Sequence, residues 1–325
     1  MRLKGHTRFE SIHSTRMAGF LQTLYVVPAA ILIGLVFLLP LIQSLVFSLQ
    51  KSAGVAGTKG WNGLGNYSDE LHSTTFWQVG LQTVVWTIAV LLLTILISLV
   101  LAVLLEDPFP GRKYFRVLLM TPWAVSMAVS AVVWSFALQP NGLVDATLRA
   151  VRLQQLIRPW LANTPTATVM LILVGTWVSV PFNTVLISAG MSAIPPAIYE
   201  AADLESDKRI GRVWFITLPL IRPVLRVAVL AGFISIFNSF PIIYIMTGGG
   251  PVYKTHIYAT YLYDLAFINL DMGHASAIAV MVSLILLATS LLYVRVVSDR
   301  GYRKGSYEQV LGSSTEDPIQ VLQVA

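Results

Sequence analysis

The stretch Tyr199–Pro223, YEAADLESDKRIGRVWFITLPLIRP, concentrates charged residues between two long apolar runs. Pro195 and Pro196 precede it, and proline is favoured in the first turn of a helix, where its missing N–H costs no hydrogen bond. Ser206 and Gly211 weaken the helical pattern further along. The stretch therefore predicts two short helical pieces with a bend between them. On charge alone, a solvated loop between membrane helices is the favoured interpretation.

The spacing inside this stretch resembles the EAA loop of the inner-membrane permease subunits of binding-protein-dependent ABC importers. That loop reads Glu-Ala-Ala, two residues, Asp-Gly-Ala, and later an aromatic residue and Ile-x-Leu-Pro. The matching residues are Glu200, Ala201, Ala202, Ile216, Leu218 and Pro219. The departing residues are Glu205, Ser206, Asp207 and Val213. The serine matters most among these, because it resists the φ > 0 bend that a glycine permits.

In that family the loop is a coupling helix, which docks into a cleft on a cytoplasmic ATPase. The resemblance implies a role for this loop in transmitting the ATPase cycle to the membrane helices. The residues to which this ATPase-coupling role is carried over are Glu200, Ala201, Ala202, Glu205, Ser206, Leu218 and Pro219.

The composition is that of a membrane protein. Of the 325 residues, 55% are hydrophobic and 12% are charged, and the mean hydropathy is +0.71. Soluble domains carry roughly 25% charged residues, so most of this chain's surface is expected to face the lipid bilayer or other apolar surfaces. The net charge of +6 is attributed to loop topology and not to nucleic-acid binding. The absence of cysteine excludes disulfides, thiol nucleophiles and cysteine-based metal sites.

Six apolar runs are long enough to span a bilayer, which requires about 20 residues. The expected helices are 20–48, 79–105, 114–138, 166–191, 220–246 and 274–297. The predicted organisation is all-α: a cytoplasmic segment 1–19, a transmembrane domain 20–297 that carries the loop 199–223, and a disordered cytoplasmic tail 298–325.

The distribution of lysine and arginine fixes the expected orientation. The segments on the N-terminal side of the membrane hold 16 such residues, and the opposite segments hold six. The positive-inside rule therefore places both termini and the loop 199–223 in the cytoplasm of a multi-pass protein of the inner or plasma membrane. Arg149, Arg152 and Arg158 are exceptions on the outer side, where they indicate an amphipathic segment.

Motifs in the outer loops extend the resemblance to about residues 20–297. Gly63–Tyr67 (GLGNY) resembles the G-x-x-N-Y of sugar-type permeases, and Thr247–Pro251 (TGGGP) and Gly273–Ala277 (GHASA) resemble the MalF-like subunit. The resemblance implies the six-helix type I importer permease fold. It also implies a second, MalG-like permease, an ABC ATPase dimer that carries the ATP and Mg, an extracytoplasmic solute-binding protein and a carbohydrate solute.

The sequence offers no chemistry for an enzyme. It contains no phosphate-binding GxxxxGK[ST] loop, no G-x-S-x-G and no H-E-x-x-H, and its five histidines are not spaced as metal ligands. No catalytic residue, metal or bound cofactor is therefore expected in this chain. The spans also lack acidic and basic residues near their centres, which proton- and ion-coupled carriers usually need. A secondary carrier without an ATPase thus becomes the less favoured alternative.

Neutral polar residues interrupt the fourth and fifth spans and are the candidates for the substrate path. They are Ser179, Asn183, Ser235, Asn238, Ser239 and Tyr244. Hydroxyl and amide groups exchange hydrogen bonds with sugar hydroxyls without desolvating a charge. Ser235, Asn238 and Ser239 stand at positions i, i+3 and i+4, so we expect them to share one face of the fifth span. The alternative is that these groups only join helices.

The resulting hypothesis is a permease subunit of an ABC importer for a sugar, oligosaccharide or polyol. A glycerol-phosphate-type solute remains an alternative within the same class, because arginine near the mouth of the path would suit a phosphate.

Overall fold

The computed structural model describes residues 27–29, 31–52, 54, 58–205 and 209–298. Within these ranges almost all regular structure is helical, which confirms the all-α class, and one small antiparallel hairpin is added to it. The expected segment 1–19, nearly all of the expected tail 298–325, and Ser206 lie outside the described residues.

The chain forms two compact units, each described here by itself. Unit 1 comprises Met1–His72 and Leu262–Met281, and unit 2 comprises Ser73–Tyr261 and Val282–Ala325. Unit 1 is therefore assembled from two segments that lie far apart in the sequence.

Unit 1 begins with the apolar helix Val27–Ser48. Its described elements are a π-helical turn η1 (Gly34–Leu38), α2 (Leu39–Ser48), β1 (Gln50–Ser52), β2 (Thr58–Trp61), α3 (Gly65–His72), the end of α14 (Tyr258–Tyr263), η5 (Asp264–Ile268) and the first part of α15 (Met272–Ser298). In the hairpin, Gln50 pairs with Trp61 and Ser52 pairs with Thr58.

Asn66 holds unit 1 together where the first span ends. Its side chain is 1% exposed, and its Nδ2 donates hydrogen bonds to the carbonyl oxygens of Ser48 and Gln50, each at 2.8 Å. Its Oδ1 accepts one from Asn62 at 2.8 Å. A Cβ at Gly273 would stand 2.7 Å from the Gln50 oxygen, so only glycine fits there. The GLGNY and GHASA motifs thus meet in one packed site.

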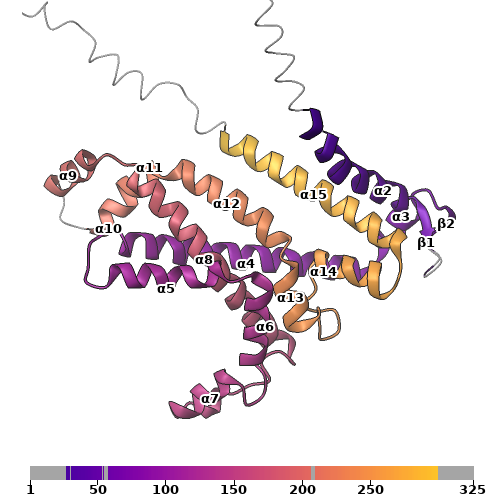
Figure 1. Cartoon of the computed structure of the whole chain (residues 1–325), viewed down its shortest axis with the longest axis horizontal. Coiled ribbons are helices and arrows are strands. Elements are labelled where there is room, and N and C mark those ends of the chain that lie inside the picture. Colours follow the sequence, from indigo (N-terminus) through magenta and orange to yellow (C-terminus); the bar gives the residue numbers. More distant parts are fainter. Residues whose placement is uncertain (1–26, 30, 53, 55–57, 206–208, 299–325) are drawn as a thin grey trace, which may run out of the picture. The chain divides into compact units, whose positions relative to one another are not determined.

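Unit 2 contains the remaining elements (Figure 1). They are α4 (Thr74–Leu104), α5 (Arg112–Ala124), α6 (Met127–Ala137), α7 (Leu143–Ala150), η3 (Gln154–Leu156), α8 (Thr164–Ser192), α9 (Pro196–Glu205), α10 (Arg209–Arg212), η4 (Val213–Thr217), α11 (Leu218–Leu220), α12 (Arg222–Phe237), α13 (Phe240–Thr247), most of α14 and the end of α15. Figure 1 shows α7 standing away from the other helices of this unit.

Five segments of the described chain are long and apolar enough to cross a membrane, and one bent pair makes a sixth span if it is counted once. The pair is α5 and α6, which meet at 97°. The expected continuous helix 114–138 is therefore wrong in shape, because Val125 and Ser126 adopt extended backbone between the two pieces. The expected helix 220–246 is also interrupted, since α12 ends at Phe237.

The core of unit 2 lies where α4 crosses α8. The Trp86 side chain is 2% exposed and donates from Nε1 to the Ile236 carbonyl oxygen at 3.0 Å. A Cβ at Gly175 would come within 2.6 Å of the Trp86 ring, so glycine is what allows α8 to approach α4 this closely. The same cluster includes Val90, Leu171, Val174, Ile242, Ile243 and Ile257.

Candidate functional site

A pocket of about 320 Å³ opens in unit 2 beside the bend between α5 and α6. We call it the span pocket. Its lining residues are Trp123, Met127, Val178, Ser179, Phe182, Asn183, Ala231, Gly232, Ser235 and Ile236. They come from α5, α6, α8 and α12, so the pocket lies where four membrane-spanning pieces approach one another.

Three of the predicted substrate-path residues line the span pocket: Ser179, Asn183 and Ser235. The Ser179 hydroxyl donates to the Gly175 carbonyl oxygen at 2.8 Å, and Asn183 Nδ2 donates to the Ser179 carbonyl oxygen at 2.9 Å. Asn183 is 6% exposed, whereas Ser235 is exposed. The two α8 residues are thus fixed by their own helix, and the α12 residue faces them from another element.

The other three predicted substrate-path residues do not line the span pocket. The Asn238 side chain is exposed and donates to the Ile234 carbonyl oxygen at 3.0 Å. Ser239 is 5% exposed, and its hydroxyl lies 3.6 Å from the sulfur of Met127, a pocket residue. The ring of Tyr244 stacks on that of Phe240, with 4.8 Å between centroids.

The expectation that Ser235, Asn238 and Ser239 share one helix face is wrong. Asn238 ends α12 and Ser239 precedes α13, with a ψ of 72° that is not helical. The break follows from Pro241, whose ring clashes with the carbonyl of the residue four positions earlier, which is Phe237. Phe237 is the last residue of α12.

Two aromatic side chains of the span pocket escaped the sequence reasoning. Trp123 on α5 and Phe182 on α8 stack with their ring centroids 6.2 Å apart and their planes at 24°. Aromatic residues in apolar runs are usually taken for core or lipid-facing residues. The neighbouring Pro122 was the available signal, because proline inside a helix weakens it locally and such breaks are where a span can open a cavity.

The chemistry of the span pocket is neutral. Of the described residues that line it, none is charged, and its polar groups are two hydroxyls, one amide and the indole N–H of Trp123. Such groups orient a ligand by hydrogen bonds, while aromatic and aliphatic groups cover its apolar faces. The pocket therefore has the chemistry for a small polyhydroxylated molecule and lacks a counter-charge for a phosphate or carboxylate.

The loop 199–223 folds as the sequence predicts at its ends. Pro196 opens α9, and α10 follows the three residues 206–208 that lie outside the described residues. Ala201, Ala202 and Glu205 belong to α9, and Leu218 and Pro219 begin α11. The described parts of the loop are short helical pieces, and the stretch between α9 and α10, where the bend was predicted, lies outside the described residues.

Tyr199 joins this loop to the membrane helices. Its ring packs against a buried cluster at the ends of the spans, formed by Ala102, Ile187, Met191, Ile194 and Ile221. The Tyr199 hydroxyl lies 3.4 Å from Thr217 Oγ1, and the Arg212 guanidinium stands 5.4 Å above the ring centre. Burial raises the pKa of the Tyr199 phenol, so the hydroxyl keeps its proton at neutral pH and can donate.

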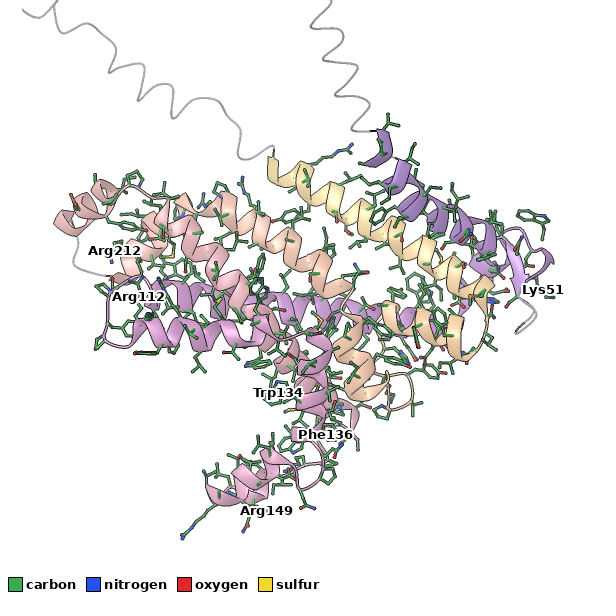
Figure 2. The ribbon with its side chains drawn as sticks, in the orientation of Figure 1. Lys51, Arg112, Trp134, Phe136, Arg149 and Arg212 are labelled. Carbon is green, nitrogen blue, oxygen red and sulfur yellow. The ribbon has the colours of Figure 1, made fainter. Side chains whose placement is uncertain are left out.

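A second pocket, of about 380 Å³, lies beside Tyr199, and we call it the loop pocket. It is lined by Ala102, Leu105, Glu106, Arg112, Arg116, Ser188, Met191, Ser192, Ile194, Pro196, Tyr199 and Glu200. Figure 2 places Arg112 and Arg212 at the same end of unit 2 and Arg149 on the distant α7. Charges of both signs thus gather where α9 leaves the membrane helices.

The motif Thr247–Pro251 forms a closed turn at the end of α13. The Thr247 hydroxyl lies 2.9 Å from the Thr255 hydroxyl, and the Thr255 N–H donates to the Gly249 carbonyl oxygen at 3.1 Å. Gly249 has a φ of 78°, and a Cβ there would overlap the buried ring of His256. Both the backbone and the packing therefore require glycine.

No group of three or more histidine, aspartate or glutamate side chains within the described ranges is arranged to hold a metal ion.

Relatives of known name resemble the chain over most of its length. A probable ABC transporter permease of Brucella suis is 35% identical, covering 83% of this chain and 94% of its own. The sulfoquinovosyl glycerol permease SmoG of Agrobacterium fabrum is 30% identical, covering 85% and 90%. The trehalose/maltose permease MalF of Thermococcus litoralis is 30% identical, covering 84% and 92%.

A solved structure shares the fold. It is a bacterial alginate ABC transporter in complex with an alginate pentasaccharide-bound periplasmic protein, which matches with a TM-score of 0.78 at 20% identity and covers 90% of this chain and 99% of its own. The family model of the binding-protein-dependent transport system inner membrane component matches residues 94–304. Together with its apolar helices, this match shows that the chain is a multi-pass membrane protein of the binding-protein-dependent transport system inner membrane component family.

Proposed function

We propose that this chain is one of two permease subunits of an ABC importer and that it forms part of the translocation path for a carbohydrate. The span pocket carries the proposal, because it combines hydroxyl and amide groups with an aromatic pair and no charged lining residue. The printed names of SmoG and of the Thermococcus MalF, both sugar-related permeases, support the same solute class.

A neutral carbohydrate is favoured over a glycerol phosphate by the placement of the arginines. Arg112 and Arg116 line the loop pocket, and the described lining of the span pocket contains no arginine or lysine. A phosphate moved into the span pocket would have no charge-assisted hydrogen bond to replace its water shell. Family membership also disfavours a secondary carrier that works without an ATPase.

The proposed mechanism is alternating access driven from outside the membrane. A solute-binding protein delivers the carbohydrate, and an ATPase dimer, which holds the ATP and Mg, closes and moves α9. A second, MalG-like permease completes the path. Since a two-state element shifts only by differential binding, the ATPase must hold α9 differently in its open and closed states.

The proposed topology places both termini and α9 in the cytoplasm. Val252 in the TGGGP turn region is 80% exposed, so a cysteine at that position should react with an impermeant thiol reagent in intact cells. A cysteine at Ser306 should not react. The neighbouring Thr255, which is 1% exposed, is unsuitable as a labelling position. Because the chain has no native cysteine, the background is low. Labelling at position 306 but not at 252 would reverse the orientation.

Affinity purification and uptake together test the proposal. A tagged chain should retain a second permease and an ABC ATPase, and uptake should require ATP and be competed by one or more neutral sugars from a panel. Asn183→Leu should raise the sugar concentration needed for half-maximal uptake while the purified complex keeps its composition. Uptake that follows a proton gradient without ATP, or that accepts only phosphorylated polyols, would contradict the proposal.

A further inference from the structure

Tyr199 is distinguished from its neighbours on α9 by burial. Of the α9 residues whose side chains are described, 196–200, the other four are exposed and Tyr199 is half-buried. Figure 1 shows α9 projecting at one end of unit 2. A force applied to the projecting helix can reach the spans through the backbone connections at its two ends or through a packed side chain, and in this described part Tyr199 is that side chain.

The contacts of the Tyr199 ring lead to three membrane helices. The cluster it packs against contains Ala102 from α4, Ile187 and Met191 from α8, and Ile221 at the start of α12. All four side chains are less than 5% exposed. Close-packed side chains do not deform independently, so displacement of the ring must displace the ends of these spans.

The other contacts of Tyr199 lead to the returning limb of the loop. Arg212, the last residue of α10, stands over the ring at 5.4 Å, and Thr217, the last residue of η4, lies 3.4 Å from the hydroxyl. Thr217 is 1% exposed, so this limb is anchored in turn. One side chain therefore ties the outgoing and returning limbs of the loop together and to the spans.

The loop pocket gives this anchor room to move. The pocket, of about 380 Å³, is lined by the Tyr199 end of α9 and by Glu106, Arg112 and Arg116 around the turn between α4 and α5. Glu106 also hydrogen-bonds the Tyr199 hydroxyl, so a tilt of α9 into this open space would change that contact as well.

We propose that Tyr199 is the positioning residue that transmits movement of α9 to the ends of α4, α8 and α12. This inference rests on the proposed coupling function of the loop. It assigns transmission to a residue outside the set expected to contact the ATPase, which begins at Glu200. Tyr199 touches neither the solute nor the nucleotide, so its loss should separate ATP hydrolysis from transport without removing either partner.

The test uses the complete purified complex in liposomes and measures solute transported per ATP hydrolysed. Tyr199→Leu keeps an apolar side chain in the cluster but removes the ring under Arg212 and the hydroxyl near Thr217. It should lower transport per ATP about tenfold, the size of an ordinary coupling between two sites, with ATPase retention unchanged. Tyr199→Phe keeps the ring but removes the hydroxyl that hydrogen-bonds Thr217 and Glu106. It should lower the ratio about threefold, which is within the usual range for lost hydrogen bonds.

Tyr293→Leu is the matched control. Tyr293 is also half-buried in unit 2, and its hydroxyl donates to the Arg226 carbonyl oxygen at 3.0 Å. Its replacement should leave transport per ATP unchanged. Equal losses in Tyr199→Leu and Tyr293→Leu, or loss of the ATPase from Tyr199→Leu complexes, would overturn the inference. If Tyr199→Leu does not assemble, Tyr199→Phe decides: an unchanged ratio overturns it.

Glu200→Lys separates this inference from the function on which it rests. If Glu200→Lys and Tyr199→Leu both transport normally, the loop is not a coupling element at all. If Glu200→Lys is inactive while Tyr199→Leu keeps the wild-type ratio, coupling stands and the role of Tyr199 is wrong.

Discussion

The span pocket and the loop pocket differ in charge although they are similar in size and belong to the same unit. The span pocket, of about 320 Å³, has no charged residue among its ten lining residues, whereas the loop pocket, of about 380 Å³, has four among twelve. The first is built from membrane helices and the second from their ends and connecting loops. The comparison shows that the charged side chains lie at the ends of the membrane helices and not between them. This difference decides which pocket suits a neutral ligand and which suits a charged partner.

The difference follows from the surroundings. A charged side chain at membrane depth is costly unless it is paired or reaches water, and the polar residues of the span pocket are neutral groups such as Asn183 and Ser235. At the loop pocket, Glu106 and Arg116 lie near the end of α4 and the start of α5, where water lowers that cost. The neutral span pocket, which we propose for the solute, and the charged loop pocket, which we propose for coupling, thus lie in one unit.

Reversing a charge at the loop pocket should have the largest effect. Glu200→Lys places a third cationic side chain beside Arg112 and Arg116. We propose that the Glu200 carboxylate, which is exposed in this chain, pairs with a basic residue of the docked ATPase. Breaking a charge pair that docking has buried costs on the order of a few kcal/mol. Uptake of labelled sugar should fall to background while membrane insertion is unchanged. Glu200→Gln, which only neutralises the charge, should retain part of the activity.

If Glu200→Lys took up sugar normally, the charges of the loop pocket would be an ordinary solvated surface. The proposed coupling role of the loop pocket would then be wrong.

Introducing a charge into the span pocket should have the next largest effect. Asn183→Asp keeps the shape of the side chain but puts a carboxylate at a position that is 6% exposed and removes the donor to the Ser179 carbonyl oxygen. An unpaired buried charge costs about 3–5 kcal/mol, so uptake of a neutral sugar should fall about a hundredfold or more.

Asn238→Asp is the matched control, because Asn238 is exposed and does not line the span pocket. It should lose much less uptake than Asn183→Asp. Equal losses at the two positions would mean that the span pocket does not define the solute path.

Removing one ring of the Trp123–Phe182 pair should have a smaller effect on uptake. It tests whether the aromatic side chains of the span pocket contribute to sugar binding. Trp123→Ala deletes the ring that stacks on Phe182. The apparent affinity for sugar should fall about tenfold, given the area that an aromatic ring buries. Trp177→Ala is the control, because Trp177 is also partly exposed and ring-paired, with Trp134, yet lies outside the pocket. If only Trp177→Ala lowered the affinity for sugar, the sugar would not bind at the span pocket.

Two buried carboxylates outside the spans should show the smallest effects, with opposite pH dependence. Burial raises the pKa of Glu70, against the partial effect of His274, and the nearby Asp271 and Asp69 raise it further. Protonated Glu70 therefore stabilises the folded protein at pH values below the ordinary pKa of a glutamate. This stabilisation is lost as the pH rises through the raised pKa of Glu70. Glu70→Gln should raise the unfolding temperature at pH 8 more than at pH 5, by about 2–4 °C.

Asp145 is the opposite case. The Trp160 indole N–H donates to it at 2.8 Å, and the Asn141 backbone N–H donates at 2.9 Å; these bonds lower the pKa of Asp145. Ionised Asp145 therefore stabilises the folded protein at pH values above the ordinary pKa of an aspartate. This stabilisation is lost as the pH falls through the lowered pKa of Asp145. Asp145→Asn should therefore lower the unfolding temperature at pH 7, and the deficit should shrink in acid. A pH-independent deficit would contradict this assignment.

The sequence predicted the elements of the fold better than their bends. Length and apolar composition suffice to locate spans, because the bilayer sets both. Helix breaks are harder to locate, because a proline does not always end a helix. Pro241 ends α12 at Phe237, four residues before the proline, whereas Pro181 lies inside α8 without ending it. The structure ties α8 to another helix beside Pro181, where the Ser98 hydroxyl donates to the Val180 carbonyl oxygen at 3.0 Å, although the carbonyl that Pro181 itself leaves without a donor is that of Trp177. Such support is not visible in the sequence of α8.

The candidate site was predictable in part for the same reason. Ser179 and Asn183 stood out as polar residues in an apolar run, and the structure brings them together with Ser235. Trp123 and Met127 could not be singled out, because their place in the span pocket depends on the 97° bend between α5 and α6. Asn238 was included because the helix was expected to continue through it, and the break at Phe237 leaves it outside the pocket.

The two-segment construction of unit 1 imposes an order on biogenesis. Asn66 secures the end of the first span, but the glycine that packs against it is Gly273, and the second segment of the unit begins roughly 190 residues after the first one ends. At a synthesis rate of about 5–20 residues per second, the first span waits about 10–40 s in the bilayer for its partner. During that interval Asn66 can already hold the Ser48 and Gln50 carbonyl groups. The packed site around Asn66 is therefore completed only after the second segment of the unit has been synthesised.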